Sequence, residues 1–199
     1  MEVFCMAPPA KVNRELIIEV GLNLIREEGI DSLNIRKIAT ELKCSTRPIL
    51  YYYKTMDELK KAVYDKADEY HSQYIMTKTE DTANPLLSIG LRYIHFAQEE
   101  KNLFRFLFQS NSFQNGSFRE LLANGDNPII QPLCEAAGLT VEQAKEVFEM
   151  LFICVHGVAS LIANNSISYD EQYYEKLLTN TFYGAVGIVR GGQPNDEVL

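Results

Sequence analysis

Residues 29–59 of the chain read GIDSLNIRKIATELKCSTRPILYYYKTMDEL. Gly29 suits the C-terminus of a preceding helix, and Asn34 is a good N-cap for a short helix that continues to Leu42. Lys43-Cys44-Ser45 forms the turn, and Ser45 is expected to cap a third short helix, Thr46–Tyr53, with Pro48 tolerated in its first turn. Two short helices joined by a tight turn predict a helix-turn-helix.

Helical periodicity extends on both sides of this segment, and no sustained two-residue alternation indicates a strand. A helix is expected from Lys11 to Glu28, with an apolar stripe of Leu16, Ile17, Val20, Leu24 and Ile25. A long helix is expected over Asp57–Met76, and Thr77–Pro85 resembles a linker. Further helices are expected at Leu86–Glu99, Leu103–Gln109, Phe118–Ala123, Pro128–Ala137, from the capping box at Thr140 to Ala163, and Asp170–Val189. The fold class is therefore all-α, with about nine helices.

The third helix has two distinct faces. Ile49 and Tyr53 share one face and are expected to pack inward, whereas Thr46, Leu50 and Lys54 form the opposite face, with Arg47 and Tyr51 beside them. Arg47, near the helix N-terminus, suits guanine, since a guanidinium matches O6 and N7. Arg36 and Lys37 can reach bases or phosphates from the second helix. The alternative is a solvated surface with no DNA contact.

The charge distribution fits DNA binding through one face. The net charge is −8, but residues 1–62 hold 10 Lys/Arg against 9 Asp/Glu, whereas residues 63–199 hold 9 against 18. Between Leu33 and Lys54 there are five cations and one acid, Glu41. A locally basic segment on an acidic body favours nucleic-acid binding by that segment alone.

At this point the sequence resembles a known family. The run Gly29-x3-Leu33-Asn34-Ile35-x2-Ile38-Ala39, followed by Ser45-x3-Ile49, Tyr53 and Asp57-Glu58-Leu59, resembles the DNA-binding domain of the TetR family. The resemblance covers residues 11–60. It implies a dimeric transcriptional repressor that binds a palindromic operator and is released by a small molecule.

The resemblance also implies roles for single residues. Arg36, Thr46 and Arg47 are expected to face bases, and Tyr52, at the family's histidine position, to contact phosphate. Three residues depart from the family pattern: Lys43 replaces the turn glycine, Leu50 a DNA-contacting tyrosine, and Met56 a phosphate-binding lysine. The complete predicted DNA interface is Asn34, Arg36, Lys37, Ser45, Thr46, Arg47, Leu50, Tyr51, Tyr52 and Lys54.

The remainder of the chain is expected to form the effector-binding and dimerisation domain, residues 57–199, after a DNA-binding domain of residues 1–56. The resemblance implies a homodimer through the last two long helices, residues 141–189; a helix buried within a monomer is the alternative. The predicted contacts with a mostly apolar effector are Tyr93, Phe96, Phe104 and Phe108. Aromatic residues at helical spacing also occur in ordinary cores.

Other functional classes find little support. The enzyme motifs GxSxG, GxGxxG, the Walker loop and HExxH do not occur, so no catalytic activity is predicted. His71, His95 and His156 do not suggest a metal site, and no cofactor is expected. The four scattered cysteines are typical of reduced thiols in a cytoplasmic protein. Met1–Ala7 does not resemble a signal peptide, and no apolar segment was expected to approach the roughly 20 residues of a membrane span. A helical interaction module without operator binding is the competing hypothesis.

Overall fold

A computed structural model describes residues 12–77, 85–110 and 127–191 of the chain. Within these ranges the chain forms nine α-helices and one 3-10 turn, and no strand occurs. The expected all-α fold is confirmed. The helix predicted at Phe118–Ala123 and most of the predicted linker and C-terminal tail lie outside the described residues.

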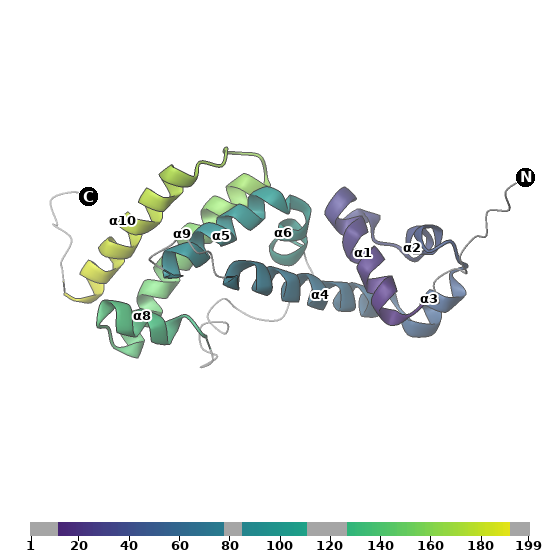
Figure 1. Cartoon of the computed structure of the whole chain (residues 1–199), viewed down its shortest axis with the longest axis horizontal. Helices are drawn as coiled ribbons and strands as arrows, with labels where there is room; N and C mark the ends of the chain where they lie inside the picture. Colours follow the sequence, from purple (N-terminus) through teal and green to yellow (C-terminus); the bar gives the residue numbers. More distant parts are fainter. Residues whose placement is uncertain (1–11, 78–84, 111–126, 192–199) are drawn as a thin grey trace, which may run out of the picture. The chain divides into compact units, whose positions relative to one another are not determined.

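The chain divides into two compact units, residues 1–68 and 69–199. The first unit contains α1 (Arg14–Glu28), the turn η1 (Ile30–Ser32), α2 (Ile35–Glu41), α3 (Arg47–Tyr52) and the first part of α4 (Met56–Met76). The second contains the rest of α4, α5 (Pro85–Glu99), α6 (Lys101–Phe108), α8 (Ile130–Ala137), α9 (Val141–Ala163) and α10 (Glu171–Val189). Helix α4 thus contributes residues to both units (Figure 1).

Capping side chains define several helix ends. Asn13 begins α1 by accepting a hydrogen bond from the Leu16 amide at 2.8 Å, a cap that the sequence analysis missed. Asn34 caps α2 as predicted. The predicted Ser45 cap of α3 is wrong: Thr46 is the N-cap residue, and its side chain makes no capping hydrogen bond. Its backbone is already helical, and Pro48 removes one of the two amides that a cap would bond.

The first unit is built around a close crossing of α1 and α4. A Cβ added at Gly21 would lie 2.9 Å from Cγ2 of Val63 and 3.1 Å from Cδ1 of Leu33. Ile49 and Tyr53 are buried, as the two-faced pattern predicted. The other buried apolar side chains of this core include Ile17, Ile25, Ile38, Ala39, Leu59, Val63 and Ala67. This core holds the inner side of α3 against the unit.

Helix α9 is the central element of the second unit. It packs against α5, α6, α8 and α10 (Figure 1). The predicted capping box is present, since the Gln143 amide donates to Oγ1 of Thr140 at 3.2 Å and the Thr140 amide donates to Oε1 of Gln143 at 3.0 Å. Arg105 donates to the carbonyl of Ala163, which anchors the C-terminal end of α9 to α6.

The length and composition of α9 correct one expectation. Its 23 residues include an 18-residue window of mean hydropathy 1.7, which suffices to cross a membrane. The prediction that no segment approaches this length and hydropathy is therefore wrong. Core helices of globular proteins pass the same test. Only 28% of the window is buried inside the chain, so much of this apolar helix remains to be covered.

Candidate nucleic-acid interface

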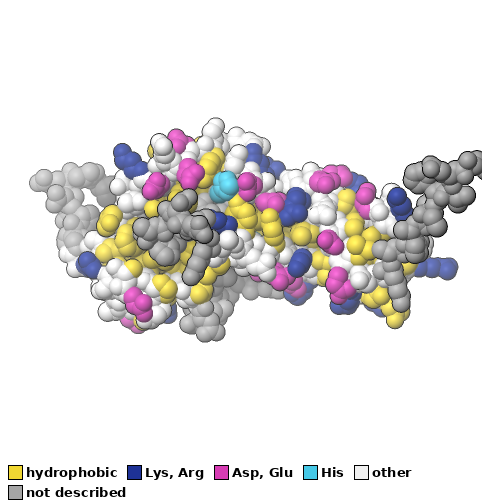
Figure 2. All heavy atoms as spheres, in the orientation of Figure 1, with side chains coloured by type: hydrophobic (Ala, Val, Ile, Leu, Met, Phe, Trp, Pro, Cys, Tyr) yellow, Lys and Arg dark blue, Asp and Glu magenta, His cyan; other side chains and the backbone are white. Residues whose placement is uncertain are grey.

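The N-terminal end of α3 presents the side chains that the sequence assigned to base recognition. Arg47 is the first residue of α3 and is exposed, Ser45 is exposed, and Thr46 is half-buried at the N-cap. Farther along the helix, Leu50 is 42% and Tyr51 72% exposed. Figure 2 shows apolar side chains together with Lys and Arg at the surface over α2 and α3. This edge combines a guanidinium with apolar and hydroxyl-bearing groups, which suits base edges in a major groove.

The turn between α2 and α3 is left-handed at Lys43, whose φ is 50°. The Lys43 amide donates to the carbonyl of Thr40 at 3.0 Å, and the Cys44 amide donates to that of Ala39 at 2.9 Å. A left-handed residue costs about 1–2 kcal/mol unless it is glycine. The geometry explains why a glycine suits this position, and it shows that lysine accommodates the same turn.

Helix α2 contributes one exposed cation and one that is already paired. Arg36 is exposed. The Nζ of Lys37 forms an ion pair with Glu28, at the end of α1. Asn34 accepts from the Lys37 amide at 2.9 Å and donates to the carbonyl of Ser32 at 3.2 Å. Asn34 therefore has a structural role at the helix end, and any DNA contact would have to compete with these bonds.

The C-terminal end of α3 is held by polar contacts. The Nζ of Lys54 donates to the carbonyl of Tyr51 at 3.1 Å and lies 5.4 Å from the centre of the Tyr51 ring. The half-buried Tyr52 meets Tyr51 edge to face, at 5.2 Å between ring centres. Its carbonyl accepts a hydrogen bond from Arg14 of α1 at 3.2 Å. These contacts fix the Tyr51–Lys54 segment within the first unit.

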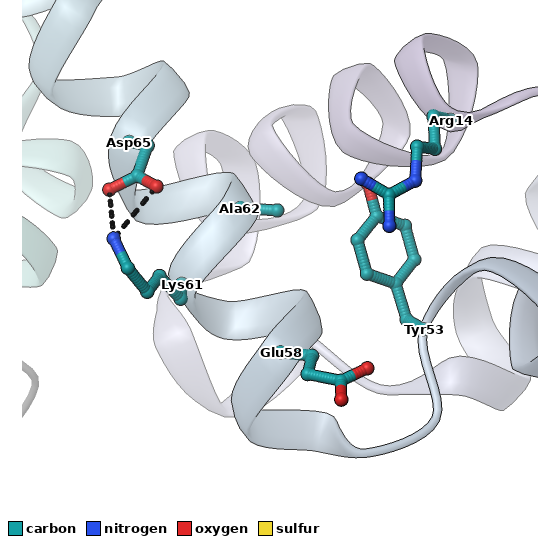
Figure 3. Close-up of a pocket in the computed structure, with 6 residues that line it drawn as sticks. All are labelled: Arg14, Tyr53, Glu58, Lys61, Ala62 and Asp65. Carbon is teal, nitrogen blue, oxygen red and sulfur yellow. Dashed lines mark hydrogen bonds and ion pairs between the residues drawn. The ribbon is translucent and has the colours of Figure 1, made fainter.

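A hollow of about 270 Å³ lies next to this segment and is shown in Figure 3. The Arg14 guanidinium lies 5.1 Å from the centre of the Tyr53 ring, and burial raises the pKa of Tyr53. Lys61 is bound to Asp65 at 2.9 Å. Since Arg14 and Lys61 are both engaged, we assign the hollow to the packing of α1 on α4 rather than to a ligand.

The second unit brings the predicted effector residues together. Tyr93 and Phe96 of α5 and Phe104 of α6 are buried, and Phe108 is half-buried. The ring centres of Phe104 and Phe108 are 4.9 Å apart, and Tyr93 lies 5.8 Å from Phe104 and 5.6 Å from Phe108. We call these four rings, together with His71, Phe152 and His156, the aromatic cluster.

The last three members of the aromatic cluster were not predicted as effector contacts. His71 belongs to α4, and its ring centre lies 4.8 Å from that of Phe96. Phe152 and His156 belong to α9 and are stacked at 5.5 Å. A signal for His71 exists in the sequence, because it continues the four-residue spacing of Leu59, Val63 and Ala67, which places it on the buried stripe of α4.

Another histidine lies outside the aromatic cluster. His95 contacts the Tyr74 hydroxyl through Nδ1 at 2.8 Å, and its Nε2 lies 3.6 Å from Oε1 of Glu99. This i, i+4 pair of His95 and Glu99 was overlooked in the sequence analysis. No group of three potential metal ligands occurs within residues 12–77, 85–110 and 127–191.

Comparison with known proteins shows what the first unit and the fold resemble. Residues 17–63, which contain the helix-turn-helix, match the model of the family "Bacterial regulatory proteins, tetR family". This segment of the chain is therefore similar to the N-terminal part of TetR-family regulators. No curated protein matches the chain. Several solved structures share its fold.

One of these TetR-family structures, from Streptomyces coelicolor, is 17% identical, with a TM-score of 0.56 over 84% of this chain and 96% of its own. A TetR-like regulator from Rhodococcus is 14% identical, with a TM-score of 0.57 over 91% and 100% of the two chains. A TetR variant from Acinetobacter baumannii, solved with minocycline, is 17% identical, with a TM-score of 0.51 over 91% and 96%.

The matched segment contains α2, α3 and the turn between them, which form the helix-turn-helix. The family match extends through most of α1, α2 and α3 into α4, so it includes most of the core that fixes the inner face of α3. The departures at Lys43, Leu50 and Met56 all lie inside the matched segment. They alter individual side chains at the surface and the turn, while the buried frame is retained.

Proposed function

We propose that the chain is a ligand-responsive, sequence-specific transcriptional repressor that binds a palindromic operator as a dimer. The observation that carries this proposal is Arg47, exposed at the start of a helix whose inner face is fixed by Ile49 and Tyr53. A guanidinium held in this way can make a bidentate contact with guanine. Residues 1–56 would form the DNA-binding domain, and residues 57–199 the effector-binding and dimerisation domain.

The homodimer would form through residues 141–189. On α9, Ile153 and Leu161 are exposed and lie in one row with Gly157. On α10, Tyr183 and Ile188 are exposed, and, apart from the adjoining residues and helix backbone, no atom of the described residues lies within 4 Å of a Cβ added at Gly184, Gly187 or Gly157. Small residues allow helices to approach closely, and an apolar face of this kind suits a second copy. Two copies would read two half-sites symmetrically.

The effector would bind in the aromatic cluster. Tyr93, Phe96, Phe104 and Phe108 would supply its apolar surface, and the minocycline complex of the Acinetobacter protein supports small-molecule binding by this fold. Helix α4 carries His71 in the aromatic cluster and Leu59 and Val63 in the core of the first unit. A displacement of α4 would therefore couple effector binding to DNA binding, with a coupling energy of about 1–3 kcal/mol.

A repressor of this kind would act in the cytoplasm, would not insert into a membrane and would have no catalytic role. The N-terminal part of α9 carries Glu142, Lys145, Glu146 and Glu149. Four charged side chains near one end make burial of all of α9 in lipid costly, whereas a dimer leaves them at its rim.

Fluorescence anisotropy with DNA from upstream of the gene, at two salt concentrations, tests the proposal. Wild-type protein should bind tightly and more weakly at high salt. Arg47→Ala should lose about tenfold to a hundredfold in affinity, since a good bidentate contact contributes about 1–3 kcal/mol. Lys61→Ala is the control, because Lys61 is paired with Asp65 on α4. Absence of salt-dependent binding would favour the interaction-module hypothesis.

A further inference from the structure

The aromatic cluster contains a buried polar atom that the packing leaves without a partner. His71 is 6% exposed, and its ring makes T-shaped contacts with those of Tyr93, Phe96 and Phe108, whose centres are 5.2, 4.8 and 5.1 Å away. Among the described residues, no group hydrogen-bonds to its buried Nε2. Such an atom costs about 1–3 kcal/mol, so its retention calls for a functional explanation.

The other polar members of the aromatic cluster form a pair. The Tyr93 hydroxyl lies 2.9 Å from Nδ1 of His156. The His156 ring is stacked on Phe152 with an angle of 12° between the planes. His156, Phe152 and Phe108 are only half-buried, so these three members of the cluster are partly accessible.

Neither imidazole in the aromatic cluster carries charge at neutral pH. Burial lowers the pKa of His71 to about 4, and burial also lowers the pKa of His156. The remaining members are a phenol and four phenyl rings. The cluster therefore offers flat apolar faces and neutral hydrogen-bonding groups, with nothing among its members to balance an ionic ligand.

We propose that the effector is an uncharged, planar aromatic compound whose hydroxyl group hydrogen-bonds to Nε2 of His71. This inference rests on the proposed function, since it names the class of molecule for the effector site. A hydroxyl both donates and accepts, so it pairs with either tautomer of neutral imidazole. A carboxylate on the same ring system would enter the cluster without a positive partner.

Binding of three fluorescent probes tests the proposal: 2-naphthol, naphthalene and 2-naphthoate. The chain contains no tryptophan, so naphthyl fluorescence can be excited above the absorption of the protein. Wild-type protein should bind 2-naphthol at least tenfold more tightly than 2-naphthoate. His71→Phe should weaken 2-naphthol about tenfold and change naphthalene less than twofold, because only the hydroxyl loses its partner.

His95→Phe provides the matched control, since His95 lies outside the aromatic cluster, beside Tyr74. It should leave the affinity for 2-naphthol within twofold of wild type. Circular dichroism checks that both variants remain folded, and His71→Phe should melt no lower than wild type, because it removes an unpaired buried nitrogen.

Three results would overturn the proposal: no probe binds at 1 mM, 2-naphthoate binds as tightly as 2-naphthol, or His71→Phe weakens naphthol and naphthalene equally. The same preparations are also titrated with operator DNA. If DNA binds while the probe pattern fails, only the effector class is wrong. If the probe pattern holds and DNA does not bind, the proposed function is wrong.

Discussion

The two units of this chain use their polar side chains in opposite ways. In the first unit, Arg36 and Arg47 are exposed on α2 and α3, while the apolar side chains behind them fix the helices. In the second unit, His71 is buried among rings from α5 and α6. A surface that recognises a polyanion needs exposed cations, whereas a cluster that recognises a small aromatic molecule needs buried, neutral groups. Different substitutions are therefore needed to test the function of each unit.

The largest effect is expected from a charge on the uncovered face of the second unit. Ile153→Glu should leave the protein monomeric at micromolar concentration and lower operator affinity at least a hundredfold, since an unpaired carboxylate in an apolar interface costs several kcal/mol. Light scattering and anisotropy measure the two effects. Ile167→Glu, in the loop between α9 and α10, should remain dimeric. If the Ile153→Glu protein remains dimeric, the dimer interface does not include Ile153.

Low pH should destabilise the second unit through protonation of His71. Its pKa is about 4 in the folded chain, against 6.5 as the ordinary value, so the unfolded chain binds the proton more tightly. The stability that depends on the neutral ring is complete above pH 6.5 and is lost as the pH falls through about 4. The difference corresponds to roughly 3 kcal/mol. Denaturant unfolding of wild type should weaken over this range more than that of His71→Phe; parallel curves would contradict the assignment.

The first unit should be most sensitive at the helix crossing rather than at its surface. Gly21→Ala places a methyl group against the stiff Val63 side chain and should lower the free energy of unfolding by roughly 1–3 kcal/mol. Gly187→Ala makes no such contact with another helix among the described residues and should leave the fold intact. Thermal melts of both variants check this, and an unchanged Gly21→Ala protein would mean that α1 and α4 lie farther apart.

The sequence revealed the first unit more completely than the second. Asn34, Ile49, Tyr53 and the basic edge follow from local rules of capping, periodicity and charge. The prediction that Ser45 caps α3 is wrong because Thr46 is the N-cap residue and its backbone is already helical. Residue type alone does not indicate this backbone conformation. In the second unit, the pairing of Tyr93 with His156 joins residues 63 positions apart, and no local pattern contains such information.

Substitutions of two side chains on the edge of α3 should weaken DNA binding in different ways. Leu50→Ala should lose roughly 1 kcal/mol, and mainly on operators with a particular thymine, since leucine covers a C5-methyl group. Tyr52→Phe should weaken all sequences about equally, because phosphate contacts carry no sequence information. A panel of half-site variants separates the two. If Leu50 instead packs on α1, Leu50→Ala will lower the melting temperature and leave base preference unchanged.

The smallest effect is expected at the turn. Lys43→Gly should stabilise the first unit by about 0.5–1 kcal/mol, because glycine relieves the left-handed strain but gains more freedom in the unfolded chain. Lys43→Ala keeps the strain and removes the same charge, so it is the control. Equal melting temperatures for the two variants would show that the turn carries no strain.

In the proposed complex, two copies of the first unit bind one symmetric DNA site. Light scattering of the complex with a DNA fragment that holds a single inverted repeat tests it directly. We expect a mass of two chains per fragment. Tight binding should be lost when either half-site is scrambled or when the salt concentration is raised. One chain bound per fragment, with one half-site sufficient for full affinity, would contradict it.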